Sequence, residues 1–307
     1  MTKKRWFAIL IFIQVVVASL IIVKWPDNRL HVITCDVGQG DAILISYRFQ
    51  QMLIDGGRDE KVLDCLNHYM PMGDRTIEVV VATHADADHI AGLAQVLESF
   101  KVLKLISTQQ GKQTDDFKRF WELVQVEKST GMRLIYPQPQ QVVWLVGPLS
   151  AKVVSTSGSR SIEPPLITTK TETRLSDVFT QNKKKTIDYN DGSIVVLLQF
   201  GEQLFLFTGD LEKTGELALI KTGLLRRVNV LKVGHHGSKS SSGRAFLGVL
   251  RPEITLISVG EANQYGHPSP QVIQRLLEVG ANTYRTDQQG NIEVVADGSH
   301  LFVKTQK

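Results

Sequence analysis

The sequence predicts an α/β protein in which two β-sheets pack face to face and helices cover their outer faces. Short turns join predicted strands as hairpins at residues 31–45 and 193–207, whereas a purely parallel sheet would need long crossovers. Helical stretches follow these hairpins, which places the helices outside the sheets. The 307 residues can bury one large core, and no internal repeat is evident.

Each predicted element has a local signature. Apolar, β-branched runs predict strands at residues 31–35, 42–45, 79–82, 193–200, 203–207, 230–233 and 254–259. Amphipathic stretches predict helices at residues 61–70, 90–100, 115–128, 243–250 and 270–279. Residues 155–190 are mostly polar and cannot bury enough surface to fold alone, so we predict a flexible loop there, either a solvated connection or a lid over a site.

The first 28 residues form a separate unit, which precedes a domain at residues 29–307. Lys3, Lys4 and Arg5 stand before an apolar stretch at residues 6–23, at the short end of what spans a bilayer. No small-residue cleavage site follows it. We therefore expect a single-pass membrane anchor with the domain extracytoplasmic, and secretion after signal cleavage is the alternative.

Charge and cysteine content restrict the function only weakly. The formal net charge of +4 permits an anionic partner without requiring one. Cys35 falls in a predicted strand and Cys65 in a predicted helix. An extracytoplasmic domain permits a disulfide, but the spacing does not show that the two meet, and we expect each to be a small buried apolar residue.

The densest group of potential metal ligands is His84-x-Asp86-x-Asp88-His89, directly after the predicted strand at residues 79–82. A strand end is a rigid support for converging side chains. Imidazole nitrogen and carboxylate oxygen suit zinc or a harder ion such as manganese. The alternative, a polar loop, is less favoured because packing does not require so many ionisable groups beside a core.

These residues resemble the metallo-β-lactamase superfamily, whose pattern is His-x-His-x-Asp-His, with Asp86 in place of the second His. This variant is similar to the extracytoplasmic hydrolase domain of ComEC-type competence proteins. The resemblance covers roughly residues 30–300, and its further segments follow in colinear order at residues 36–42, 53–57, 207–210, 232–238 and 265–268.

The resemblance implies a four-layer αββα sandwich and a site for two divalent ions, zinc or manganese. It assigns His84 and Asp86 to one ion, Asp88 and His89 to the other, and Asp210 to both. Asp88 would also belong to the catalytic group.

Two consecutive histidines, His235 and His236, follow the predicted strand at residues 230–233. Side chains alternate along extended chain, so we expect only one to face the metals, as a ligand or as a proton donor. His267 would be the remaining ligand of the pattern, and we favour His235 and His267 over His236. Ser238 and Lys239 are candidates for contacts with a substrate phosphate, although the serines could equally cap a helix.

One position departs from the superfamily pattern, because no histidine occurs from residue 90 to residue 234. The ComEC-like pattern instead implies Asn190 or Asp191 near the first metal. An oxygen-rich first site favours manganese as a candidate beside zinc. Its ligands must be deprotonated, so metal binding should weaken in acid.

Three classes of function follow. The first is a membrane-anchored phosphodiesterase, for which the resemblance implies DNA as substrate and a DNA-uptake machine as partner, with cell-wall choline phosphate or a small diester as alternatives. The second is a hydrolase of lactones or β-lactams, which the Asp86 variant disfavours. The third is a non-catalytic binding module, which the nearly complete ligand set disfavours.

Overall fold

The computed structural model describes residues 5–6, 9–14, 25–155 and 190–307. The loop predicted at residues 155–190 therefore lies almost wholly outside the described residues, as does part of the predicted anchor at residues 6–23. Among the residues described, none of the helices combines the length and the apolar character needed to cross a bilayer.

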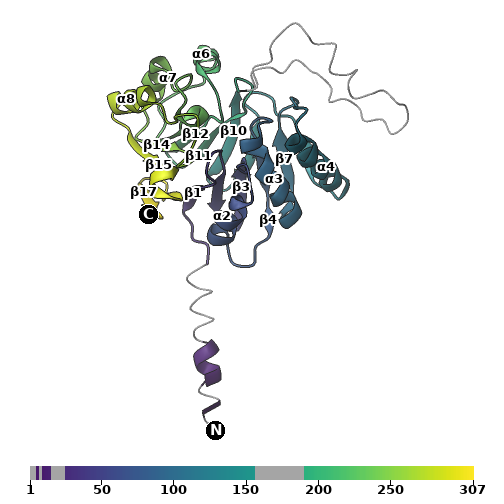
Figure 1. The fold of residues 1–307 in the computed structure, drawn as a ribbon. Coiled ribbons are helices and arrows are strands. Elements are labelled where there is room, and N and C mark those ends of the chain that lie inside the picture. The colour runs from purple at the N-terminus through teal and green to yellow at the C-terminus, as the bar shows by residue number, and fades with distance from the viewer. Residues whose placement is uncertain (1–4, 7–8, 15–24, 156–189) are drawn as a thin grey trace, which may run out of the picture.

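Two large sheets form the body of the protein (Figure 1). The first has eight strands in the order β17-β16-β1-β2-β3-β5-β7-β8, and the second has seven in the order β15-β14-β13-β12-β11-β10-β9. The first comprises β1 (Leu30–Thr34), β2 (Ile43–Tyr47), β3 (Gln50–Ile54), β5 (Val79–Ala82), β7 (Lys104–Ser107), β8 (Arg133–Ile135), β16 (Ile292–Ala296) and β17 (Leu301–Thr305). The second comprises β9 (Val142–Val146), β10 (Leu149–Ser155), β11 (Val195–Phe200), β12 (Gln203–Phe207), β13 (Val230–Lys232), β14 (Ile254–Ile257) and β15 (Asn282–Arg285).

Each sheet is antiparallel on one side and parallel on the other. The parallel runs are β3-β5-β7-β8 and β12-β13-β14-β15. The main helices of the parallel halves are α2 (Lys61–Tyr69), α3 (Ala87–Ser99), α4 (Asp115–Ser129), α6 (Lys213–Lys221), α7 (Arg244–Leu250) and α8 (Pro270–Glu278). Smaller elements are β4 (Thr76–Ile77), β6 (Lys101–Val102), η2 (Gly234–Gly237) and α9 (Thr286–Gln289).

Three apolar clusters show that the layers are helix, sheet, sheet and helix. One cluster joins the facing sides of the sheets, with Ile45 and Val81 from the first and Phe205 and Phe207 from the second. A second packs the first sheet against α2, α3 and α4, and a third packs the other sheet against α6, α7 and α8. The predicted sandwich is therefore confirmed, and both predicted hairpins pair in antiparallel register.

Two local predictions need correction. Helix α3 begins at Ala87, not at residue 90, so Asp88 and His89 lie in its first turn. Cys35 and Cys65 form a disulfide and are not merely buried apolar residues. The end of β1 and helix α2 pack in the same apolar cluster, which brings the two Cα atoms to 5.9 Å, within the range that a disulfide spans.

Candidate metal centre

The first group of site residues lies between β5 and α3. The backbone bends sharply there because β5 ends in the core and α3 starts within a few residues. Asp86 occupies the N-cap position of α3, yet its side chain makes no capping hydrogen bond. A glycine-rich turn passes close beneath: the backbone N–H of Asp41 donates to the carbonyl of Asp88, and a Cβ on Gly40 would lie 2.2 Å from that oxygen.

Asp210 approaches this group from the second sheet, just past the end of β12. The preceding Gly209 has a φ of 52°, and a Cβ there would meet the Thr83 side chain at 3.0 Å. The glycine therefore allows the loops of the two sheets to meet. The backbone N–H of Asp210 donates to Ser193 Oγ at 3.2 Å, which fixes the start of this turn.

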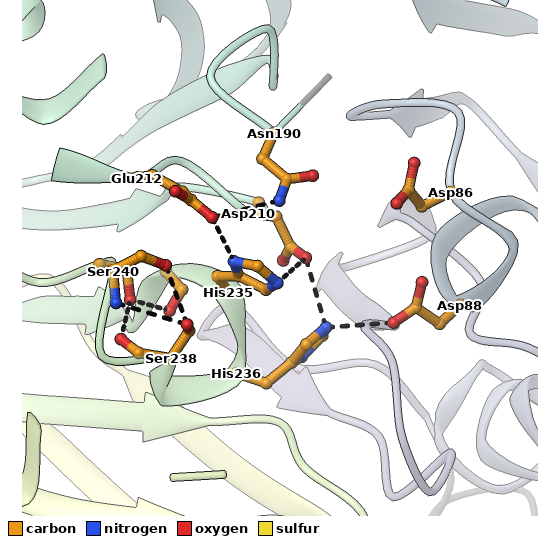
Figure 2. Close-up of polar contacts among 12 residues, drawn as sticks. Asp86, Asp88, Asn190, Asp210, Glu212, His235, His236, Ser238 and Ser240 are labelled. Atoms are coloured by element: carbon orange, nitrogen blue, oxygen red, sulfur yellow. Dashed lines mark hydrogen bonds and ion pairs between the residues drawn. The ribbon is translucent and has the colours of Figure 1, made fainter. Parts of the chain in front are cut away.

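Both consecutive histidines face Asp210, contrary to the expected alternation (Figure 2). His235 and His236 lie in η2 with φ values of 49° and 51°, so the chain is left-handed there and not extended. Their Nε2 atoms lie 3.7 Å and 3.5 Å from Asp210 Oδ2. The expectation that only one of the two faces the metals rested on alternation, and this geometry removes its basis.

Four buried polar atoms converge at the centre of the site. His89 Nε2 lies 3.4 Å from Asp210 Oδ1, His236 Nε2 lies 3.4 Å from Asp88 Oδ2, and His84 Nε2 lies 3.9 Å from Asp210 Oδ2. The three Nε2 atoms and Asp210 Oδ1 are buried and have no hydrogen-bond partner among the residues that the structure describes. Unpartnered buried polar atoms are costly, and bound divalent cations would satisfy all four. The residues therefore fit a metal.

Four of the nine predicted metal ligands, His84, Asp88, His89 and Asp210, belong to close groups of potential ligand atoms. Within 4.8 Å of one another lie the triads His84, His89, Asp210 and Asp88, His89, His236. Asp41 enters two further triads, one with Asp55 and His89 and the other with Asp210 and His236.

One of these carboxylates and one backbone carbonyl face the outer nitrogens of two imidazole rings. Asp55 Oδ2 lies 2.8 Å from His89 Nδ1, and Asp55 also accepts from the backbone N–H and hydroxyl of Thr83. His236 Nδ1 donates to the Ser258 carbonyl at 2.9 Å. These contacts turn both Nε2 atoms toward the centre, as outer partners of ligating histidines do.

Lys232 was not anticipated from the sequence. This last residue of β13 is fully buried and forms an ion pair with Asp41. Its Nζ also donates to the Gly209 carbonyl at 3.0 Å and lies 3.8 Å from Asp210 Oδ1. Two sequence features could have indicated this pair. A lysine ends an apolar strand, and Asp41 stands in a glycine-rich turn within the segments of the family resemblance.

The electrostatics favour positive charge at the centre. Burial, together with the neighbouring His89, lowers the pKa of His84 to about 4. Burial also opposes protonation of His236, but Asp210 and Asp41 raise its pKa to about 10. The pKa of Asp210 is held well below its usual value, because His236 and His89 outweigh the effect of burial. The carboxylates that favour a protonated His236 would also stabilise a divalent cation at the centre.

Several predicted ligands lie outside these groups. Asp86 forms an ion pair with Lys112. Asp191 Oδ1 accepts the backbone N–H groups of Glu212 and Gly215 and so holds the start of α6. The Asn190 amide donates to Glu212 at 3.3 Å, beside Asp210 (Figure 2).

The remaining candidates border the centre. The ring of His267 lies 5.7 Å from that of His235 and stacks on Tyr265. Ser238 Oγ is hydrogen-bonded to Ser240 Oγ at 2.9 Å. Lys239 is exposed beside them. None of these three residues enters a close group of ligand atoms among the described residues.

Comparison with known proteins agrees with this geometry. Residues 35–261 match the family described as the metallo-beta-lactamase superfamily. The chain belongs to this superfamily. It is 27% identical over 282 residues to ComE operon protein 3 of Bacillus subtilis, a match that covers 84% of this chain and 32% of the relative. It is 39% identical over 113 residues to competence protein ComA of Neisseria gonorrhoeae, covering 36% and 16%.

These matches confirm the resemblance to ComEC-type competence proteins. The chain spans about a third or less of the length of these relatives. Among solved structures, the metallo-beta-lactamase fold protein YhfI from Bacillus subtilis aligns with a TM-score of 0.51 at 12% identity, over 90% of this chain and 100% of that one. At this identity the alignment shows the fold alone, so the metallo-hydrolase class comes from the superfamily and the reaction must be argued from the site.

Proposed function

We propose that this chain is a metal-dependent phosphodiesterase that acts on DNA outside the cytoplasm. One observation carries the proposal: the unpartnered Nε2 atoms of His84, His89 and His236 converge with Asp210 in a buried, carboxylate-rich centre. Carboxylates make the donor set harder than the usual histidine-rich one, which suits manganese as well as zinc and the transfer of charged phosphoryl groups.

Asp88, His89 and His236 would hold one ion, His84 and Asp86 the other, and Asp210 would bridge them. When bound, two divalent ions lower the pKa of a water molecule and neutralise charge on a phosphate. Asp55 and the Ser258 carbonyl orient the two imidazoles in advance.

We assign His235 the role of proton donor to the leaving oxygen. Its Nδ1 lies 2.9 Å from Glu212 Oε1, and its side chain is partly exposed where a substrate would enter. Glu212 would hold the ring in the orientation that directs Nε2 toward Asp210 (Figure 2). Ser238 and Lys239, on the same rim, would contact the phosphate backbone beyond the scissile bond.

The competence relatives favour DNA as the substrate, with DNA uptake as the process and an uptake machine as the partner. Cell-wall choline phosphate, a small diester, and a lactone or β-lactam remain the alternatives.

The disulfide between Cys35 and Cys65 supports an extracytoplasmic location, because disulfides persist in oxidising compartments. The predicted anchor at residues 6–23 would hold the domain at the membrane. When the purified full chain is alkylated without reductant, mass spectrometry should show neither cysteine alkylated, because both sulfur atoms are in the disulfide. Two alkylated thiols in protein taken from its native compartment would contradict this location.

The assay uses the metal-stripped chain with plasmid DNA, single-stranded DNA, bis(nitrophenyl) phosphate and a chromogenic β-lactam. Manganese, zinc or magnesium is added back, beside Asp210→Ala and a control, Asp116→Ala, which removes an exposed carboxylate on α4. We expect metal-dependent cleavage of DNA that Asp210→Ala loses and Asp116→Ala keeps. Hydrolysis of the small diester alone would move the substrate to other phosphodiesters, and turnover of the β-lactam alone would contradict the proposal.

A further inference from the structure

Asp86 behaves differently from the other predicted ligands. In Figure 2 its carboxylate stands apart from the contacts that join His235, Asp210, His236 and Asp88. It belongs to none of the close ligand triads among the described residues. Its Oδ1 lies 3.9 Å from His84 Nε2, one of the unpartnered buried nitrogens, so the carboxylate still borders the place where the first ion would bind.

Lys112 explains the position of this carboxylate. Its ammonium group forms an ion pair with Asp86 Oδ1, the oxygen that borders His84. Both side chains are largely shielded, at 27% and 29% exposure. Asp86 also gives up the cap of α3 that an aspartate at this position normally supplies. Because Asp86 neither caps α3 nor joins a close ligand group, we infer that its ion pair with Lys112 holds the carboxylate in place.

Packing contacts hold the loop that carries Lys112 in position. Gly111 packs against the ring of Phe117 in α4, where a Cβ would lie 2.7 Å from the ring. Thr114 caps α4 through the backbone N–H of Phe117. On the other side, Gly192 lies so close to Gln110 that a Cβ would meet its side chain at 2.7 Å. Contacts on both sides therefore fix the loop beside the centre.

We propose that Lys112 is a substrate-binding residue that exchanges partners. With a divalent ion bound at the first site, Asp86 would hold that ion in place of Lys112, and the Lys112 ammonium would bind a non-bridging oxygen of the substrate phosphate. This inference rests on the proposed function for the identity of the substrate. The exchange also implies an order of metal binding. The second site (Asp88, His89, His236, Asp210) would fill first, because binding there displaces no cation from Asp86.

Two properties of Lys112 support the exchange: its positive charge and its long, flexible side chain. A metal ion and an ammonium group compete for one carboxylate oxygen, so binding of one weakens binding of the other. A displaced lysine keeps its flexible four-carbon stem and its charge, and a compact cation beside a metal centre is a suitable partner for a phosphate oxygen. The chain would then use Lys112 to couple occupation of the first site to recognition of an anionic substrate.

Two titrations test the proposal without relying on turnover. The full chain, Lys112→Met and the control Lys118→Met are stripped of metal and titrated calorimetrically with manganese. Lys118 is an exposed residue of α4 that pairs with Asp115 at 3.1 Å, so the control makes the same change away from the centre. We expect Lys112→Met to tighten the weaker manganese site roughly tenfold, the effect of one charged hydrogen bond, with the tighter site unchanged.

The metal-loaded proteins are then titrated with inorganic phosphate. Lys112→Met should bind phosphate roughly tenfold more weakly than the parent chain, whereas Lys118→Met should match it. Unchanged manganese affinity in Lys112→Met, or a single manganese ion bound by both parent and variant, would overturn the exchange. Unchanged phosphate affinity would overturn the substrate role. Both readouts stand even if the parent hydrolyses no diester, an outcome that would refute the proposed function instead.

Discussion

Lys232 tests whether a buried cation compensates the carboxylates of the centre, because its ammonium group is fully buried beside Asp41 and Asp210. Replacing Lys232 by Met keeps the apolar stem but leaves Asp41 and Asp210 without this cation. Burial alone would raise the pKa of Asp41, and Lys232 is the largest of the influences that lower it. The variant therefore has to bury an uncompensated charge or protonate it.

Removing one partner of a buried ion pair costs about 3–5 kcal/mol. In urea unfolding at pH 7 with a chelator present, we expect Lys232→Met to lose about that much unfolding free energy, with a melting temperature lower by roughly 10 °C. The double variant Lys232→Met/Asp41→Asn removes both charges, so it should be more stable than the sum of the single changes predicts.

Two results would refute this reasoning. A loss of less than about 1 kcal/mol in Lys232→Met would show that the ammonium does not compensate the buried carboxylates. Strict additivity in the double variant would show that Lys232 and Asp41 do not act as a pair.

Two further predictions concern the scaffold. Nearby carboxylates outweigh burial and raise the pKa of His31, so its stabilising effect is full below about pH 6.5 and fades as the pH rises through the raised value. His31→Asn should cost about 1 kcal/mol of unfolding free energy at pH 6 and less at pH 9, and equal losses in urea titrations at both values would contradict this. A Cβ on Gly92 would lie 1.9 Å from the Gly56 carbonyl, so Gly92→Ala should destabilise by about 3 kcal/mol. Gly248→Ala in α7, where nothing lies within 4 Å, should instead stabilise by about 0.5–1 kcal/mol in the same assay, and a stabilised Gly92→Ala would refute the close approach.

The sequence was most informative where a strong local pattern coincides with chemistry. The apolar run before His84 predicts a strand end, and ligands at a strand end converge whatever the rest of the fold does. Glycine before Asp210 likewise indicates a close approach, and Gly209 makes one. The exposed or half-buried strands β15 and β17 have no clear alternation, so they were not predicted.

Other features depend on long-range packing or on backbone geometry that the sequence does not specify. Alternation along a strand is a sound rule, but the left-handed turn at His235 and His236 breaks it, and only the backbone shows this. The burial of Lys232 depends on Asp41, which is 191 positions earlier in the sequence. The disulfide depends on how α2 packs against β1.

The most direct test of the metal centre is the rate of bis(nitrophenyl) phosphate hydrolysis as manganese is added stepwise to the metal-stripped chain. We expect no turnover without metal, a rise in rate that levels off at about two equivalents of manganese, and no rise in Asp210→Ala. A rate that is independent of added metal and of chelator, or that Asp210→Ala retains in full, would contradict it.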